Sequence, residues 1–156
     1  MNKRSGFTLI ELIICLIVVG LIMIFVVPKI NETILNKKKD KMIEDAKLFV
    51  EKTKEYIEMN DNAIKESYGV FELKLIDPKK ELLKSPFGEK YGRKYQTIQP
   101  YASYTLVGND SNNNYKYGVC LTDGKYTLYI RDISELNSNN KYDKIKKYSF
   151  GDCEPF

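Results

Sequence analysis

An almost unbroken apolar run near the N-terminus constrains the fold of this chain more than any other feature. Between Phe7 and Ile30 the only charged side chains are Glu11 and Lys29. About 20 apolar residues are enough for a helix to cross the hydrocarbon core of a bilayer. Beyond this run the composition changes to Lys, Glu, Asn and Tyr. The 156 residues therefore predict one membrane-spanning segment followed by a water-facing region.

The start MNKR, followed by an apolar stretch, is typical of both cleaved secretory signals and permanent membrane anchors. A secretory signal ends in a small-x-small cleavage site, whereas this run closes with IMIFVVPKINET and contains no alanine. We therefore do not expect the whole segment to be removed. Lysines follow the run as well as precede it, so the positive-inside rule does not orient the segment.

Charge and composition argue against several classes of function. The formal net charge of +4 is dispersed among interleaved acids and bases, which does not indicate a nucleic-acid partner. The densest basic stretch, KKKDK at Lys37 to Lys41, is expected to be a solvated helix face near lipid headgroups. The chain has no His and no motif for hydrolysis or for an EF-hand. We expect no catalytic residue, no cofactor and no metal site.

After the apolar run, apolar residues recur every three or four positions to about Glu58, which predicts an amphipathic helix that continues the first one. The sequence NDN at Asn60 to Asn62 should end it. Pro28, with Gly20 two turns before it, predicts a kink or a locally melted stretch inside this long helix. The segment DPKKELLKS, entered at Asp77, is expected to form a short helix.

The second half of the chain predicts a small antiparallel sheet. Three stretches rich in Tyr, Thr, Val and Ile are separated by a polar loop and a tight turn, so they should pair consecutively. A fourth stretch, KIKKYSF, is a candidate edge strand whose lysines discourage stray pairing. Cys120 and Cys153 can form a disulfide in an oxidising compartment, or can remain two buried thiols. The fold class predicted is α+β, one long helix packed on this sheet.

The sequence SGFTLIEL resembles the processing site of type IV pilins and pseudopilins. The resemblance implies that a prepilin peptidase cuts between Gly6 and Phe7 and that the new amine of Phe7 is methylated. Glycine suits such a site because a peptidase groove can approach its backbone closely. The resemblance also implies that Glu11 sets the position of each subunit in a filament by pairing with the Phe7 amine of a neighbour. A charge in lipid is costly unless it is paired.

Packing between helices in a filament would then come from apolar residues near that acid, namely Ile10, Ile13, Ile14, Ile17 and Leu21. The family also has a Pro-aromatic-Gly-x-x-Tyr element before its sheet, which the sequence PFGEKY matches from Pro86 to Tyr91. The domain boundaries that follow are a leader at 1–6, a membrane or filament-core segment at 7–30, an amphipathic half-helix at 31–60 and a globular head at 61–156.

The function that this resemblance implies is a structural subunit, stored in the cell membrane and then polymerised into a type IV pilus or similar surface filament. Such filaments serve adhesion, motility, surface colonisation or DNA uptake. Expected partners are further copies of the chain, the prepilin peptidase, a platform protein and an extension ATPase. Two alternatives remain open: a minor pilin or pseudopilin of a secretion or competence system, and an uncleaved, membrane-anchored extracellular binding module.

Overall fold

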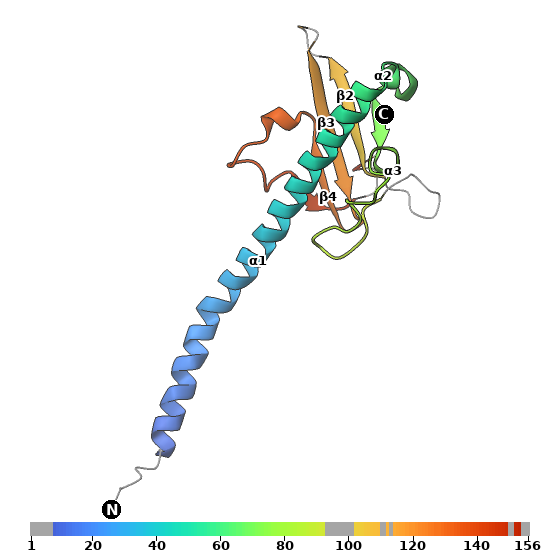
Figure 1. Ribbon diagram of the computed structural model, residues 1–156. Coiled ribbons are helices and arrows are strands. Elements are labelled where there is room, and N and C mark those ends of the chain that lie inside the picture. Colours follow the sequence, from blue (N-terminus) through green and yellow to red (C-terminus); the bar gives the residue numbers. More distant parts are fainter. Residues whose placement is uncertain (1–7, 93–101, 110–111, 113, 150–151, 154–156) are drawn as a thin grey trace, which may run out of the picture. The chain divides into compact units, whose positions relative to one another are not determined.

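The computed structural model describes residues 8–92, 102–109, 112, 114–149 and 152–153. Helix α1 (Leu9–Met59) is followed by two short helices, α2 (Ala63–Ser67) and α3 (Leu73–Ile76), and by the 3-10 turn η1 (Ile133–Glu135). Five strands complete the described chain: β1 (Val70–Glu72), β2 (Tyr104–Asn109), β3 (Tyr115–Thr122), β4 (Tyr126–Ile130) and β5 (Ile145–Lys147) (Figure 1). The chain divides into two compact units, residues 1–37 and residues 38–156.

The first unit consists, where described, of the apolar part of α1. Every large apolar side chain from Leu9 to Leu35 is exposed, with exposed fractions between 38% and 77%. The helix is long and apolar enough to cross a membrane, as judged by length and composition. Gly20 and Pro28 both lie within continuous helix, so the stretch between them is not melted here. The kink expected at this place stays a prediction.

The second unit contains the sheet, whose strands follow one another in chain order, β1-β2-β3-β4-β5, each antiparallel to the next. The meander predicted from the sequence is confirmed, and KIKKYSF supplies the edge strand β5. The opposite edge strand, β1, was not expected from the sequence. It pairs Phe71 with Thr105 of β2. Its three residues are too few for the sequence to indicate a strand, although only Phe71 among them is buried.

The core of the second unit lies between the sheet and the part of α1 that begins at Lys38 (Figure 1). Residues spaced three and four apart on this helix are buried, which is the pattern of one apolar stripe. The sheet contributes Phe71, Val119, Leu121, Leu128 and Ile130 from its facing side. Near the middle, the hydroxyl groups of Thr53 and Thr105 are 2.8 Å apart and join helix to sheet within this core.

The helix predicted at DPKKELLKS is wrong, because the helical turn α3 ends at Ile76, before this segment begins. The fully buried carboxylate of Asp77 accepts hydrogen bonds from the backbone N–H groups of Glu81 and Leu82, both at 3.0 Å. Lys80 has a φ of 60°, a left-handed value that a right-handed helix does not allow. Asp77 therefore organises a loop, where a helix had been expected from Pro78.

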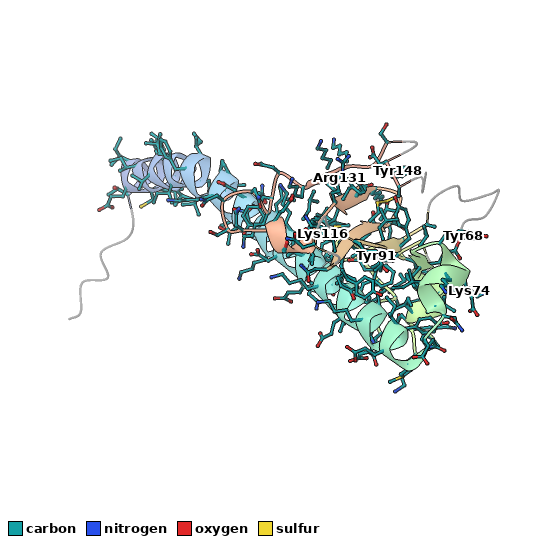
Figure 2. All side chains as sticks on the ribbon, turned by 90° about the horizontal axis from the view of Figure 1, so that it is seen from above. Tyr68, Lys74, Tyr91, Lys116, Arg131 and Tyr148 are labelled. Atoms are coloured by element: carbon teal, nitrogen blue, oxygen red, sulfur yellow. A yellow bond between two sulfur atoms is a disulfide. The ribbon has the colours of Figure 1, made fainter. Side chains whose placement is uncertain are left out.

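The Pro-aromatic-Gly-x-x-Tyr element links the loop before β2 to both layers. Phe87 stacks on Tyr126 of β4 with ring centroids 4.0 Å apart, and Gly88 has a φ of 100°. Tyr91 is buried and donates its hydroxyl hydrogen to Asp45 of α1 at 2.9 Å (Figure 2). Burial raises the pKa of the Tyr91 hydroxyl well above its ordinary value, so the group remains a donor. The element thus ties helix, loop and sheet together.

A disulfide joins Cys120 of β3 to Cys153, which lie 5.8 Å apart at their Cα atoms and 33 residues apart in sequence. It belongs to a second buried cluster, on the side of the sheet away from α1, which also contains Tyr104. Burial raises the pKa of Tyr104 to about 12. The bridge fixes the described part of the C-terminal tail to the centre of the sheet.

Gly69 offers a test of the β1 turn. Its φ is 76°, and a Cβ added there would collide with the backbone carbonyl oxygen of Val107. We expect Gly69→Ala to lower the free energy of unfolding by at least about 2 kcal/mol, because the left-handed backbone and the collision both oppose an L side chain. Thermal unfolding of the full chain measures this. Gly108→Ala is the matched control, since a Cβ there meets no atom within 4 Å; equal effects of the two would contradict the assignment.

Tyr91→Phe tests the buried bond between the loop and α1. Removing the hydroxyl takes a donor from a carboxylate that is 5% exposed, so we expect a loss of about 1–3 kcal/mol of unfolding free energy. Tyr68→Phe, at a side chain that is 93% exposed, should leave stability unchanged. Denaturant unfolding of both variants makes the comparison, and an unaffected Tyr91→Phe protein would show that the bond contributes nothing to stability.

Candidate processing and assembly site

The predicted processing residues Gly6 and Phe7 lie outside the described residues, so the site is seen from Thr8 onward. Helix α1 begins at Leu9, and Thr8 stands directly before it. The first turn of a helix has backbone N–H groups without partners inside the helix. Thr8 and Glu11 supply acceptors at this end of α1, as their hydrogen bonds show.

The side chains of Thr8 and Glu11 form a reciprocal cap. The Thr8 hydroxyl oxygen accepts from the backbone N–H of Glu11 at 3.3 Å. Oε2 of Glu11 accepts from the backbone N–H of Thr8 at 2.9 Å and from the Thr8 hydroxyl at 2.8 Å. This is the capping-box arrangement, in which a Thr before the helix and a Glu three residues later satisfy each other's backbone groups. The T-x-x-E spacing of the sequence is the signal from which this cap could have been predicted.

Glu11 therefore has a partner within its own chain. Its carboxylate also lies in the first turn of α1, where the positive end of the helix dipole favours a negative charge. Only Oε2 takes part in the cap, and within the described part of the chain Oε1 has no hydrogen-bond partner. The geometry leaves one carboxylate oxygen available to a donor from outside the chain.

The surface around Glu11 is apolar. The side chains expected to pack in a filament, Ile10, Ile13, Ile14, Ile17 and Leu21, are 44% to 63% exposed. Cys15, in the same stretch, is a free and exposed thiol. These side chains touch no second layer within the first unit, so their apolar area can be covered only by lipid or by another molecule. That requirement agrees with a helix made for a membrane or for a multi-chain core.

The remaining predicted site residues lie elsewhere. Gly20 and Pro28 are within α1, and a Cβ at Gly20 would meet no atom within 4 Å, so no close approach within the chain requires this glycine. Cys120 and Cys153 form the disulfide of the second unit. Among the described residues, no group of three or more His, Cys, Asp or Glu side chains is placed to hold a metal ion.

Comparison with known proteins identifies one segment of the chain. Residues 1–27 match the prokaryotic N-terminal methylation motif, a segment that includes the cap and most of the apolar run. No curated protein and no solved structure matches the chain. The matched segment includes Gly6, Phe7 and Glu11, and the chain continues into a second unit in which the helix packs on an antiparallel sheet. The chain therefore carries the hallmark N-terminal motif of type IV prepilin-like proteins.

Proposed function

We propose that this chain is a type IV prepilin: a structural subunit that is processed at Gly6 and Phe7, held in the membrane by residues 7–30 and then polymerised into a surface filament. The observation that carries the proposal is the methylation motif at the head of an apolar helical segment whose large side chains are 38% to 77% exposed. The motif supports processing and membrane anchoring, and the exposed apolar surface supports later packing between copies. The role is structural, without catalysis by the chain itself.

In this proposal, processing changes the electrostatics next to Glu11. Removal of MNKRSG takes away Lys3 and Arg4 and creates an amine at Phe7. An amine from a neighbouring copy can reach the Oε1 side of the carboxylate, whose Oε2 already serves the cap. Pairing of the two charges relieves the penalty of leaving either one alone in a medium of low dielectric constant. Assembly thereby acquires a preferred register.

Recovery of the N-terminus from cells tests processing directly. Mass spectrometry of the purified protein should give a chain that begins with a methylated Phe7. Gly6→Ala, which adds a methyl group to the cleavage position, should accumulate the uncut precursor. An intact Met1 in the native protein would refute the proposal and leave the alternative of an uncleaved anchored module. Electron microscopy of sheared surface material then separates filaments from monomers.

Glu11→Gln separates the charge of Glu11 from its capping role. Glutamine also serves in a capping box, so this variant keeps the cap and loses the charge, whereas Glu11→Ala loses both. We expect both variants to remain in the membrane and both to reduce the yield of sheared filaments by at least about ten-fold, the factor for roughly 1.4 kcal/mol of lost pairing. A normal yield from Glu11→Gln would show that capping alone is needed.

Thr8→Val removes the capping hydroxyl from a side chain of nearly the same shape. Loss of an N-cap weakens a helix end by about 1 kcal/mol, so the first turn of α1 should fray and the Glu11 carboxylate should lose its fixed position. Faster amide hydrogen exchange at Glu11 and Leu12, whose N–H groups bond the Thr8 hydroxyl and carbonyl oxygens, measures the fraying in detergent-solubilised protein. Thr8→Ser retains the hydroxyl and should exchange like the native chain; equal exchange in Thr8→Val would contradict the role of the cap.

A further inference from the structure

The first turn of α1 in the second unit consists of four successive residues, Lys38 to Lys41. Successive side chains leave a helix about 100° apart, so these four point in four directions around its axis. Three of them are lysines, and the fourth, Asp40, is bonded to Lys141 from the segment between β4 and β5. We name Lys38, Lys39, Lys41 and Lys141 the lysine collar.

The single acid of this turn is held by two partners. Lys141 Nζ donates to Oδ1 of Asp40 at 2.5 Å, and the Tyr142 hydroxyl lies 3.0 Å and 2.9 Å from the two carboxylate oxygens. The hydrogen bond from Lys141 is the first cause that lowers the pKa of Asp40. Asp40 is therefore ionised at neutral pH, and a lysine 101 residues away neutralises it. The turn exposes no unmatched negative charge.

The acids of the next turn are matched too. Lys41 Nζ lies 3.1 Å from Asp45 and 3.6 Å from Glu44. In contrast, Lys38 and Lys39 form no ion pair within the described part of the chain. The ammonium group of Lys39 lies 5.7 Å from the ring centroid of Tyr142, which favours its position beside the ring. Lys38 and Lys39 are thus the two cations of the collar that lack a carboxylate.

These cations lie close to the end of the apolar run along the chain. Lys38 follows Ile30 by eight residues, over which a helix rises about 12 Å. The headgroup layer adds about 5–8 Å beyond the hydrocarbon on each side of a bilayer. Helical side chains tilt toward the N-terminus of their helix, here toward the apolar run, and the long stem of lysine extends that reach. If residues 7–30 span the membrane as proposed above, an extended Lys38 side chain can reach headgroup phosphates, and Lys39 can reach them when its ammonium group leaves the Tyr142 ring.

We propose that the lysine collar binds the headgroup phosphates of anionic lipids around the helix, chiefly through Lys38 and Lys39. The charge distribution favours lipid over a protein partner. A protein docks on one face of a helix and needs a stripe of charge along it, which Lys38 and Lys39, about 100° apart around the axis, do not form. Anionic headgroups, in contrast, can meet each of the two lysines separately. Each lysine close to an anionic surface should strengthen association with an anionic lipid about five-fold.

Fluorescence quenching tests this in the full chain. The protein has no Trp, so Leu35→Trp, one turn before Lys38, supplies a single reporter. The protein is reconstituted into phosphatidylcholine vesicles that contain brominated phosphatidylglycerol or brominated phosphatidylcholine. We expect an association constant about five-fold higher for the glycerol lipid. Lys38→Gln/Lys39→Gln should lower this ratio clearly, and 1 M NaCl, where the Debye length is about 3 Å, should reduce it to near one.

The control removes the same charge elsewhere. Lys65 and Lys74 are exposed on the short helices that follow α1, and Figure 2 labels Lys74. Lys65→Gln/Lys74→Gln should retain the preference for the glycerol lipid. Equal association constants of the native protein for the two brominated lipids would overturn the proposal. Loss of the preference in the control variant Lys65→Gln/Lys74→Gln would also overturn it. Loss of the preference in soluble glycerol phosphate, but not in NaCl of the same ionic strength, would overturn it as well, by assigning the collar to free phosphate.

Retention in the membrane after alkaline carbonate extraction distinguishes the possible failures. A chain that washes off refutes the anchoring on which this inference rests, and with it the proposed function. A chain that stays in the membrane but shows no lipid preference refutes the collar alone.

Discussion

The apolar surface of the first unit is the constraint on which the rest of this molecule depends. No side chain from Leu9 to Leu35 is buried by its own chain. Hydrophobic burial contributes about 25 cal/mol for each Å² removed from water, so a helix of this kind is not stable alone in water and takes its surroundings from lipid or from other copies. The second unit, by contrast, buries its own core and has no such requirement. The proposed function gives this helix both kinds of surroundings, lipid first and other copies later.

The contacts of Glu11 in the structure differ from those that the sequence implied. From the sequence it is a lone acid in an apolar run, for which the family resemblance implies a partner in another subunit. The structure gives it a partner inside the chain, because Thr8 takes one carboxylate oxygen into a helix cap. The cap lowers the cost of keeping the carboxylate at the membrane before assembly, and it fixes where the second oxygen points. Capping and pairing between copies are therefore compatible, and the first prepares the geometry for the second.

Periodic and compositional features could be predicted from the sequence, while features that depend on single long-range contacts could not. The long helix, its end at Met59 and the consecutive pairing of β2, β3 and β4 follow from hydrophobic spacing and turn residues. Strand β1 has three residues and exists because β2 offers an edge. The helix predicted after Asp77 is not formed. The Asp-Pro sequence favours a helix start locally, but the buried Asp77 carboxylate accepts hydrogen bonds from the backbone of a loop instead. The burial of Asp45 could not be predicted from the sequence either, because its partner Tyr91 lies 46 residues away.

In the proposed function the subunit leaves the membrane, and the charge at the start of the second unit affects that step. Lysines that hold anionic headgroups resist deeper insertion, because their ammonium groups would lose both water and phosphate. The same interactions are weak individually and screened by salt, so they limit the depth of the helix without making its withdrawal costly. Lys141 extends this effect to the fold of the second unit, since its bond to Asp40 exists only when the segment between β4 and β5 is in place. If the collar lies at the headgroups as proposed, the folded segment between β4 and β5 neutralises Asp40 there, whereas a second unit without that segment in place leaves the acid uncompensated.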